Sequence, residues 1–382
     1  MHIAYVCTDP GIPVWGAKGA SIHVQEMLRA FLKRDAKVTL LTPRTEGAPP
    51  SDLAGVELHP LPPAPKGDAE SRARALLATN DTLANALDML QPDLVYERHA
   101  LMSCAAMEWS ARNDRPGVLE VNAPLIAEQA AHRQLALPEQ AETAAQRSTQ
   151  AARLSCAVTE PVAQYVRDMG GTDVIVVPNA VNPARFPAPR PRPERPFTVG
   201  FLGSMKPWHG LNTLVQAFAQ LRHVVPDARL LIVGDGPERA QIEVQVREYG
   251  LSGATEITGL LPAADVPSAL ARMDVGTAPY HAMEDFYFSP LKIYEYMAAA
   301  LPVVTTHTGD LALLVTDTET GLITPPGDAY GLTQALAQLA ADLPWAQAMG
   351  KAARAHVLAH HTWDATADHI LTRALDGKAR AA

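Results

Sequence analysis

The chain has 382 residues, of which 47% are hydrophobic and 19% charged, and these are globular proportions. This length predicts two domains rather than one core. The net charge of −9 and the pI near 5.8 argue against nucleic acid as the main partner, because no basic excess exists to neutralise phosphates. They also argue against strong adhesion to anionic lipid, so membrane association is possible but not indicated.

The cysteines and the apolar segments indicate a cellular compartment. Cys7, Cys104 and Cys156 are odd in number, scattered and free of CxxC spacing, which predicts reduced thiols in a cytoplasmic protein with neither disulfides nor a zinc site. The N-terminus enters a strand directly, so no signal peptide is expected. No uninterrupted apolar run approaches the ~20 residues that span a bilayer.

In the first half of the chain, strands and helices alternate. A strand at Ile3–Cys7, a helix at about Ser21–Lys33 and a strand at Val38–Thr42 predict a parallel sheet of the Rossmann type. Further strands are expected near residues 56–59, 92–99, 117–122, 156–159 and 174–177, and helices over 70–90 and 128–153. Ligands of such sheets bind at the carboxyl ends of the strands.

Two groups of residues follow these strands. The segment Gly16–Ser21 places two glycines before a helix, where backbone can approach a ligand closely, although a plain flexible turn is about as probable a reading. Arg98 and His99 end a strand, where a ligand is expected. His23 lies in the first turns of its helix, where a lone histidine is more often structural.

Proline density marks the domain boundary. Residues 182–196, Asn-Pro-Ala-Arg-Phe-Pro-Ala-Pro-Arg-Pro-Arg-Pro-Glu-Arg-Pro, contain six prolines among fifteen residues, which is typical of a linker. We therefore expect a first domain over 1–182, a linker over 183–196, a second domain over 197–361 and a terminal helix over 362–382.

A strand at 197–202 opens the second domain and runs into the loop Gly203–Gly210. Lys206 in this loop is the candidate cation for a diphosphate, and the alternative is a solvated lysine. Trp208 and His209 either face a sugar or pack internally. Further strands are expected at 229–233, 256–259, 274–280 and 303–306.

The segment around Ser289 predicts an anion site. Ser289 as N-cap and Pro290 at the first helical position start a helix. The N–H groups of Leu291 and Lys292 then lack intrahelical partners and attract an anion, which would also favour the lysine side chain. Glu295, nearly one turn on, could accept hydrogen bonds from a sugar diol. Together these groups indicate a nucleotide diphosphate; the alternative is an ordinary capped helix with a Lys292–Glu295 surface pair.

The stretch Phe-Tyr-Phe-Ser-Pro-Leu-Lys-Ile-Tyr-Glu-Tyr-Met-Ala-Ala-Ala-Leu-Pro-Val-Val at 286–304 resembles the C-terminal signature of the family 4 retaining glycosyltransferases. The family's signature usually has two glutamates separated by seven residues. Glu295 is the second, whereas Tyr287 occupies the first position, and Ala300 replaces the family's glycine. Ser-Pro-Leu-Lys at 289–292 resembles one branch of the family. The resemblance covers nearly the whole chain.

The resemblance implies the GT-B fold: α/β, with two Rossmann-like domains facing a central cleft and a C-terminal helix that crosses back to the first domain. It implies that the loop of Lys18, Gly19 and Ala20 meets the donor phosphates and the acceptor. Asn122 stands about where many members have a histidine, so Asn122 and Glu120 become candidates for holding the sugar or the acceptor; alternatively, Asn122 only caps the turn before Pro124. The donor-binding positions that it implies in the second domain are Gly203, Ser204, Gly234, Gly259 and Ser289 to Lys292.

The implied activity is retaining transfer of a sugar from a UDP- or GDP-sugar to a hydroxyl of a lipid, polyol or polysaccharide. The helix start and Lys206 would stabilise the leaving diphosphate, so neither metal nor other cofactor is expected. A same-face route, in which the leaving phosphate takes the acceptor proton, requires no protein nucleophile. The protein would be a monomer or homodimer. Two alternatives are a nucleotide-sugar epimerase or hydrolase and a non-catalytic sugar-nucleotide-binding protein.

Overall fold

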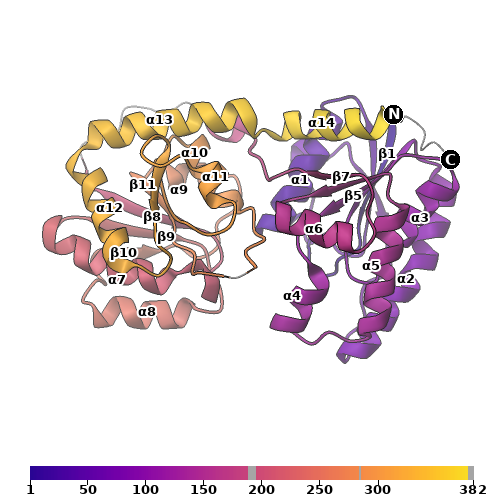
Figure 1. Cartoon of the computed structure of the whole chain (residues 1–382), viewed down its shortest axis with the longest axis horizontal. Coiled ribbons are helices and arrows are strands. Elements are labelled where there is room, and N and C mark those ends of the chain that lie inside the picture. Colours follow the sequence, from indigo (N-terminus) through magenta and orange to yellow (C-terminus); the bar gives the residue numbers. More distant parts are fainter. Residues whose placement is uncertain (188–194, 284, 377–382) are drawn as a thin grey trace. The chain divides into compact units, whose positions relative to one another are not determined.

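The computed structural model describes residues 1–187, 195–283 and 285–376. The chain divides into two compact units (Figure 1). Unit 1 contains Met1–Pro178 and the C-terminal segment from Trp363, and unit 2 contains Asn179–Thr362. Both units are parallel sheets with helices between successive strands, so the prediction of two Rossmann-like α/β domains is confirmed.

Within the described residues of unit 1, seven parallel strands form one sheet in the order β3-β2-β1-β4-β5-β6-β7. The inner strands are buried because helices cover both faces of such a sheet, whereas the edge strand β3 is largely exposed. The strands are β1 His2–Cys7, β2 Lys37–Thr42, β3 Glu57–Pro60, β4 Leu94–Arg98, β5 Gly117–Val121, β6 Leu154–Ala157 and β7 Val174–Val176. The helices are α1 Gly19–Leu32, α2 Ala69–Leu90, α3 Ala105–Arg112, α4 Leu125–His132, α5 Pro138–Ala151, α6 Glu160–Asp168 and α14 Trp363–Leu375.

Within the described residues of unit 2, six parallel strands follow the order β10-β9-β8-β11-β12-β13. They are β8 Thr198–Leu202, β9 Arg229–Val233, β10 Thr255–Ile257, β11 Val275–Ala278, β12 Val303–Thr306 and β13 Gly321–Thr324. The helices are α7 Leu211–Val224, α8 Arg239–Glu248, α9 Val266–Leu270, α10 Leu291–Ala298, α11 Leu311–Leu314, α12 Ala329–Ala341 and α13 Leu343–His360.

The predicted linker, residues 183–196, differs from the structure. Its described start belongs to unit 2, where Pro183–Arg185 forms the short 3-10 helix η2 and Phe186 is buried in the core. Arg354 of α13 donates a hydrogen bond to the Phe186 carbonyl at 2.8 Å. Proline restricts the backbone, but it does not prevent an apolar side chain beside it from packing. Residues 188–194 of the predicted linker lie outside the described residues.

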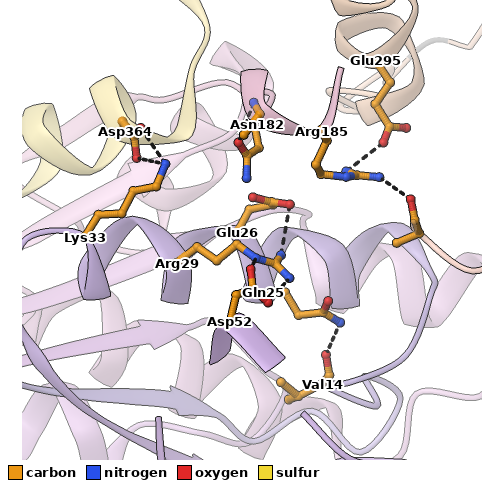
Figure 2. Close-up of polar contacts among 12 residues, drawn as sticks. Val14, Gln25, Glu26, Arg29, Lys33, Asp52, Asn182, Arg185, Glu295 and Asp364 are labelled. Atoms are coloured by element: carbon orange, nitrogen blue, oxygen red, sulfur yellow. Dashed lines mark hydrogen bonds and ion pairs between the residues drawn. The ribbon is translucent and has the colours of Figure 1, made fainter. Parts of the chain in front are cut away.

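The terminal helix α14 belongs to unit 1. It packs on α1 and β6, and Trp363 at its start is 4% exposed. Ion pairs join its acidic residues to the end of α1: Lys33 Nζ lies 3.0 Å from Asp364 (Figure 2), and Arg34 lies 2.6 Å from Asp368. The predicted terminal segment, 362–382, thus contains a helix over its first part, and residues 377–382 lie outside the described residues.

Candidate functional site

Three glycines line the carboxyl ends of neighbouring strands in unit 2. Gly203, Gly234 and Gly259 follow β8, β9 and β10, and all three have positive φ, at 133°, 142° and 74°. Gly203 donates to the Val233 carbonyl at 2.9 Å, and Gly234 forms a bridge with Gly259. A Cβ on Gly234 would lie 2.0 Å from the Gly203 carbonyl oxygen, so no side chain fits there. The strand ends therefore present bare backbone, as the sequence predicts.

The helix after this region, α10, begins later than predicted. Its first residue is Leu291, and Pro290 is the N-cap with extended backbone, so the prediction of a helix start at Ser289 was wrong. Ser289 does not cap the helix because its hydroxyl accepts a hydrogen bond from the Asn179 N–H and contacts the Tyr294 hydroxyl, both at 3.0 Å. The first N–H groups of α10 still have no intrahelical acceptor, so its N-terminus remains suited to an anion.

Lys292 lies inside unit 2 and not on an exposed turn. It is 7% exposed, and its ammonium lies 4.2 Å from the centre of the Phe201 ring and 5.2 Å from that of Tyr280. Among the described residues its Nζ has no hydrogen-bond partner, and burial lowers the pKa of Lys292 to about 7. A Cβ on Gly203 would lie 3.1 Å from this Nζ. The ammonium therefore lies beside Gly203 at the end of β8, where a bound anion would neutralise it.

The loop after β8 contains a second cation. Lys206 is half-buried, and its Nζ lies 5.6 Å from the centre of the Trp208 ring. Ser204 is exposed, and its carbonyl contacts His209 Nδ1. Burial, together with the charges of Lys292 and Lys206, holds the pKa of His209 far below its usual range, so this imidazole is neutral. Lys206 of this loop and Lys292 of α10 therefore both lie near His209.

Glu295 is paired with an arginine that the sequence interpretation missed. Arg185 Nη1 lies 3.2 Å from Glu295 Oε1, and Nη2 donates to the Ala263 carbonyl at 3.1 Å (Figure 2). Arg185 belongs to the segment predicted as linker, and the alternative Lys292–Glu295 pair does not form. The arginine is 110 positions from Glu295 in the chain, so only the fold reveals the pair. A ribose on Glu295 would bind beside, or displace, this guanidinium.

The polar candidates of unit 1 form a buried network around Glu120. Its carboxylate lies 3.0 Å from His23 Nε2, 2.6 Å from Arg98 Nη1 and 2.5 Å from the Tyr96 hydroxyl, and it also contacts the Asn122 amide. Burial alone would raise the pKa of Glu120, but His23, Arg98 and the hydrogen bonds hold it well below its usual range. The structure thus brings together four predicted site residues, His23, Arg98, Glu120 and Asn122, and their polar groups contact one another.

Another polar group lies at the end of β4. Glu97 and His99 are buried, and both ring nitrogens of His99 lack a hydrogen-bond partner among the described residues. Burial raises the pKa of Glu97 to about 7, against the hydrogen bond from Ser103, and burial lowers the pKa of His99 to about 4. His99 is therefore a neutral ring at neutral pH.

The glycine-containing loop of unit 1 is held by side-chain hydrogen bonds at its start and is exposed at its end. Gln25 on α1 donates to the carbonyls of Val14, at 2.7 Å (Figure 2), and Gly16, at 2.9 Å. Lys18 and Gly19 are exposed, and Ala20 is half-exposed in the first turn of α1. The start of α1 is consequently accessible to a ligand.

Tyr287, which occupies the position of the first signature glutamate, is 7% exposed, and its ring lies 4.3 Å from that of Phe288. Across the described residues, no group of three or more His, Cys, Asp and Glu side chains could hold a metal ion. None of the helices in the described ranges is both long and apolar enough to cross a membrane.

Comparison with solved structures defines the class of fold. The structure matches sucrose-phosphate synthase from Thermosynechococcus elongatus with a TM-score of 0.76 and 21% sequence identity, over 97% of each chain. The fold is therefore that of the GT-B glycosyltransferases, and the predicted fold class is confirmed.

Sequence comparison then places the chain within a family. A model of glycosyltransferase family 4 matches residues 17–185, and a model of glycosyl transferases group 1 matches residues 196–342. The chain belongs to the family 4 glycosyltransferases, as its signature suggested.

Individual relatives match part of the chain. Glycogen synthase from Mycobacterium tuberculosis is 29% identical over 199 residues, which are 52% of this chain and 47% of the relative. A GDP-mannose-dependent α-(1-6)-phosphatidylinositol monomannoside mannosyltransferase from Mycolicibacterium smegmatis is 31% identical over 173 residues, 44% of this chain and 45% of the relative. The matched segments thus span about half the length of these relatives.

Proposed function

We propose that this protein is a retaining glycosyltransferase that moves a sugar from a UDP- or GDP-sugar to an acceptor hydroxyl on a lipid, polyol or polysaccharide. The observation that supports it is the buried ammonium of Lys292, which has no hydrogen-bond partner among the described residues and lies beside the backbone of Gly203 at the end of β8. A nucleotide diphosphate supplies the missing negative charge, and the start of α10 supplies backbone N–H donors.

The residues of unit 2 stabilise the leaving group in this proposal. As the bond between sugar and phosphate breaks, negative charge grows on the diphosphate, and Lys206, Lys292 and the N–H groups of α10 bind it more strongly. Glu295 binds the ribose diol after exchanging its contact with Arg185. The positive charges of the two lysines make a metal ion unnecessary.

The retained configuration follows from a same-face route, in which a leaving phosphate oxygen takes the acceptor proton. This route requires no protein nucleophile. In unit 1, the accessible start of α1 meets the acceptor, whereas His99 at the end of β4 is a buried neutral ring. Glu120 holds Arg98 and His23 in place from within the protein.

A donor screen combined with product analysis tests the proposal. The Mycolicibacterium relative is named for GDP-mannose, so GDP- and UDP-sugars are the first donors to offer in a thermal-shift screen, since a ligand that binds the folded protein raises its apparent stability. A binding donor is then incubated with an acceptor panel. A new α-linked product from an α-linked donor supports the proposal. Consumption of the donor in the absence of an acceptor would indicate an epimerase or hydrolase. Binding of the donor without any turnover would indicate a non-catalytic protein.

A further inference from the structure

Five aromatic rings of unit 2 contact one another in a closed series. Trp208 and Phe288 lie parallel, with ring centres 6.0 Å apart and planes within 8°. Phe288 contacts Phe286 at 5.3 Å, Phe286 contacts Tyr280 at 5.1 Å, Tyr280 contacts His209 at 5.2 Å, and His209 returns to Trp208 at 6.0 Å. The series joins the loop after β8 to the segment before α10, which are the two segments of the proposed diphosphate site.

The members of this series differ in exposure. Tyr280 and Phe286 are 2% and 3% exposed, so they are core residues that hold the arrangement. Trp208 and Phe288 are only partly buried and pack against the core with part of each ring accessible. The partly accessible rings of the series are therefore those of Trp208, Phe288 and His209, and the first two are nearly parallel.

The position of this ring pair relative to the cations decides what it can contact. Lys206 Nζ lies 5.6 Å from the Trp208 ring centre, and Phe288 is three positions before Leu291, the first residue of α10. A diphosphate between Lys206 and the start of α10 would therefore project its sugar beside these rings. A hexose presents hydroxyls at its rim and C–H groups on its faces, and C–H groups pack well against an aromatic face.

We propose that Trp208 and Phe288 bind the transferred sugar of the donor through its C–H face. This inference rests on the proposed function and specifies how the same site recognises its sugar. Tyr287, buried against Phe288, offers no carboxylate to grip the rim hydroxyls. The ring pair selects a hexose by the shape of its face: an axial hydroxyl on the stacked face is disfavoured, and loss of a rim hydroxyl is tolerated.

Calorimetric binding of four probes, UDP, UDP-glucose, GDP and GDP-mannose, tests this inference. The readout is the ratio of Kd for the nucleotide diphosphate to Kd for its nucleotide sugar, because this ratio isolates the contribution of the sugar. Phe288→Leu and Trp208→Leu each keep apolar bulk and remove a ring. Each is expected to lower the ratio about 5- to 10-fold, with Kd for the diphosphate itself changed less than about 2-fold.

Two further variants separate a ring contact from a general effect on folding. Phe288→Tyr restores a ring at the same position and is expected to recover most of the ratio lost in Phe288→Leu. Tyr249→Leu removes an aromatic residue that is 46% exposed elsewhere in unit 2, and it is expected to leave the ratio unchanged.

The outcomes distinguish this inference from the proposed function. An unchanged ratio in both leucine variants overturns the inference, and so does a wild-type protein that binds the diphosphate and its nucleotide sugar equally well. In both cases the proposed function stands, because nucleotide binding persists. A wild-type protein that binds none of the four probes overturns the proposed function and the inference with it.

Discussion

Glu120 in unit 1 and Lys292 in unit 2 are buried charged groups with opposite surroundings. In unit 1 the Glu120 carboxylate is surrounded by donors from Arg98, His23 and Tyr96, so its charge is neutralised within the protein. In unit 2 the Lys292 ammonium is equally buried but faces aromatic rings and glycine backbone, without a hydrogen-bond partner among the described residues. Removing one partner of a paired buried charge is destabilising, whereas a buried charge without a partner is a candidate for a ligand site.

The largest effect on stability is expected at Glu120. Glu120→Gln leaves Arg98 buried without a negative partner and should lower the free energy of unfolding by about 3 kcal/mol or more, measured by urea denaturation. The matched control is Glu57→Gln, which breaks the exposed Lys37–Glu57 pair and should cost less than about 1 kcal/mol. Equal effects of the two changes would remove the distinction between the units.

The lysine of the β8 loop and the acid of α10 should both affect catalysis. Lys206→Ala and Glu295→Ala are each expected to lower the rate of sugar transfer at least ~100-fold, because each removes charge stabilisation or positioning in the transition state. Steady-state kinetics with the identified donor measure this. The melting temperature should be unchanged in Lys206→Ala and lowered in Glu295→Ala, because the second change also removes the partner of Arg185. Turnover near the wild-type rate in either variant would remove that residue from the proposed site.

A pH dependence of donor binding should follow from Lys292. Its pKa of about 7 in the free protein rises when a diphosphate binds, so binding takes up a proton. Affinity should be constant below pH 7 and fall up to about 10-fold per pH unit above it. A nucleotide sugar is the right probe because its diphosphate does not titrate in this range.

Lys292→Met should bind the donor weakly at all pH values and lose this slope. The exposed Lys351→Met on α13 is the matched control and should keep it. A slope that persists in Lys292→Met would assign the titration to another group and weaken the contrast with Glu120.

The smallest effect is expected at Ser289. Ser289→Ala removes the hydroxyl that accepts from the Asn179 N–H and contacts the Tyr294 hydroxyl, which should cost about 1–2 kcal/mol of stability. If Ser289 were an N-cap that bound the ligand directly, the same change would lower donor affinity more than stability. Comparing the change in melting temperature with the change in Kd decides between these roles.

Much of the fold and part of the site followed from local sequence patterns. Apolar runs such as Ile3–Cys7 and Arg229–Val233 predicted strands, because a strand depends on a few consecutive residues. The glycines at 203, 234 and 259 were named through the family resemblance, and the structure places each after a strand. The family signature around Glu295 predicted the fold class that the structure confirms.

Only the tertiary structure determined the electrostatic partners. It paired Glu295 with Arg185, Ser289 with Asn179 and Glu120 with His23, and it buried Lys292 against Phe201. These partners are distant in the chain, and local propensity carries no information about which residues long-range packing brings together. The start of α10 was misplaced for the same reason: Ser289 resembles a cap locally, but the fold supplies Asn179 as a competing partner for its hydroxyl.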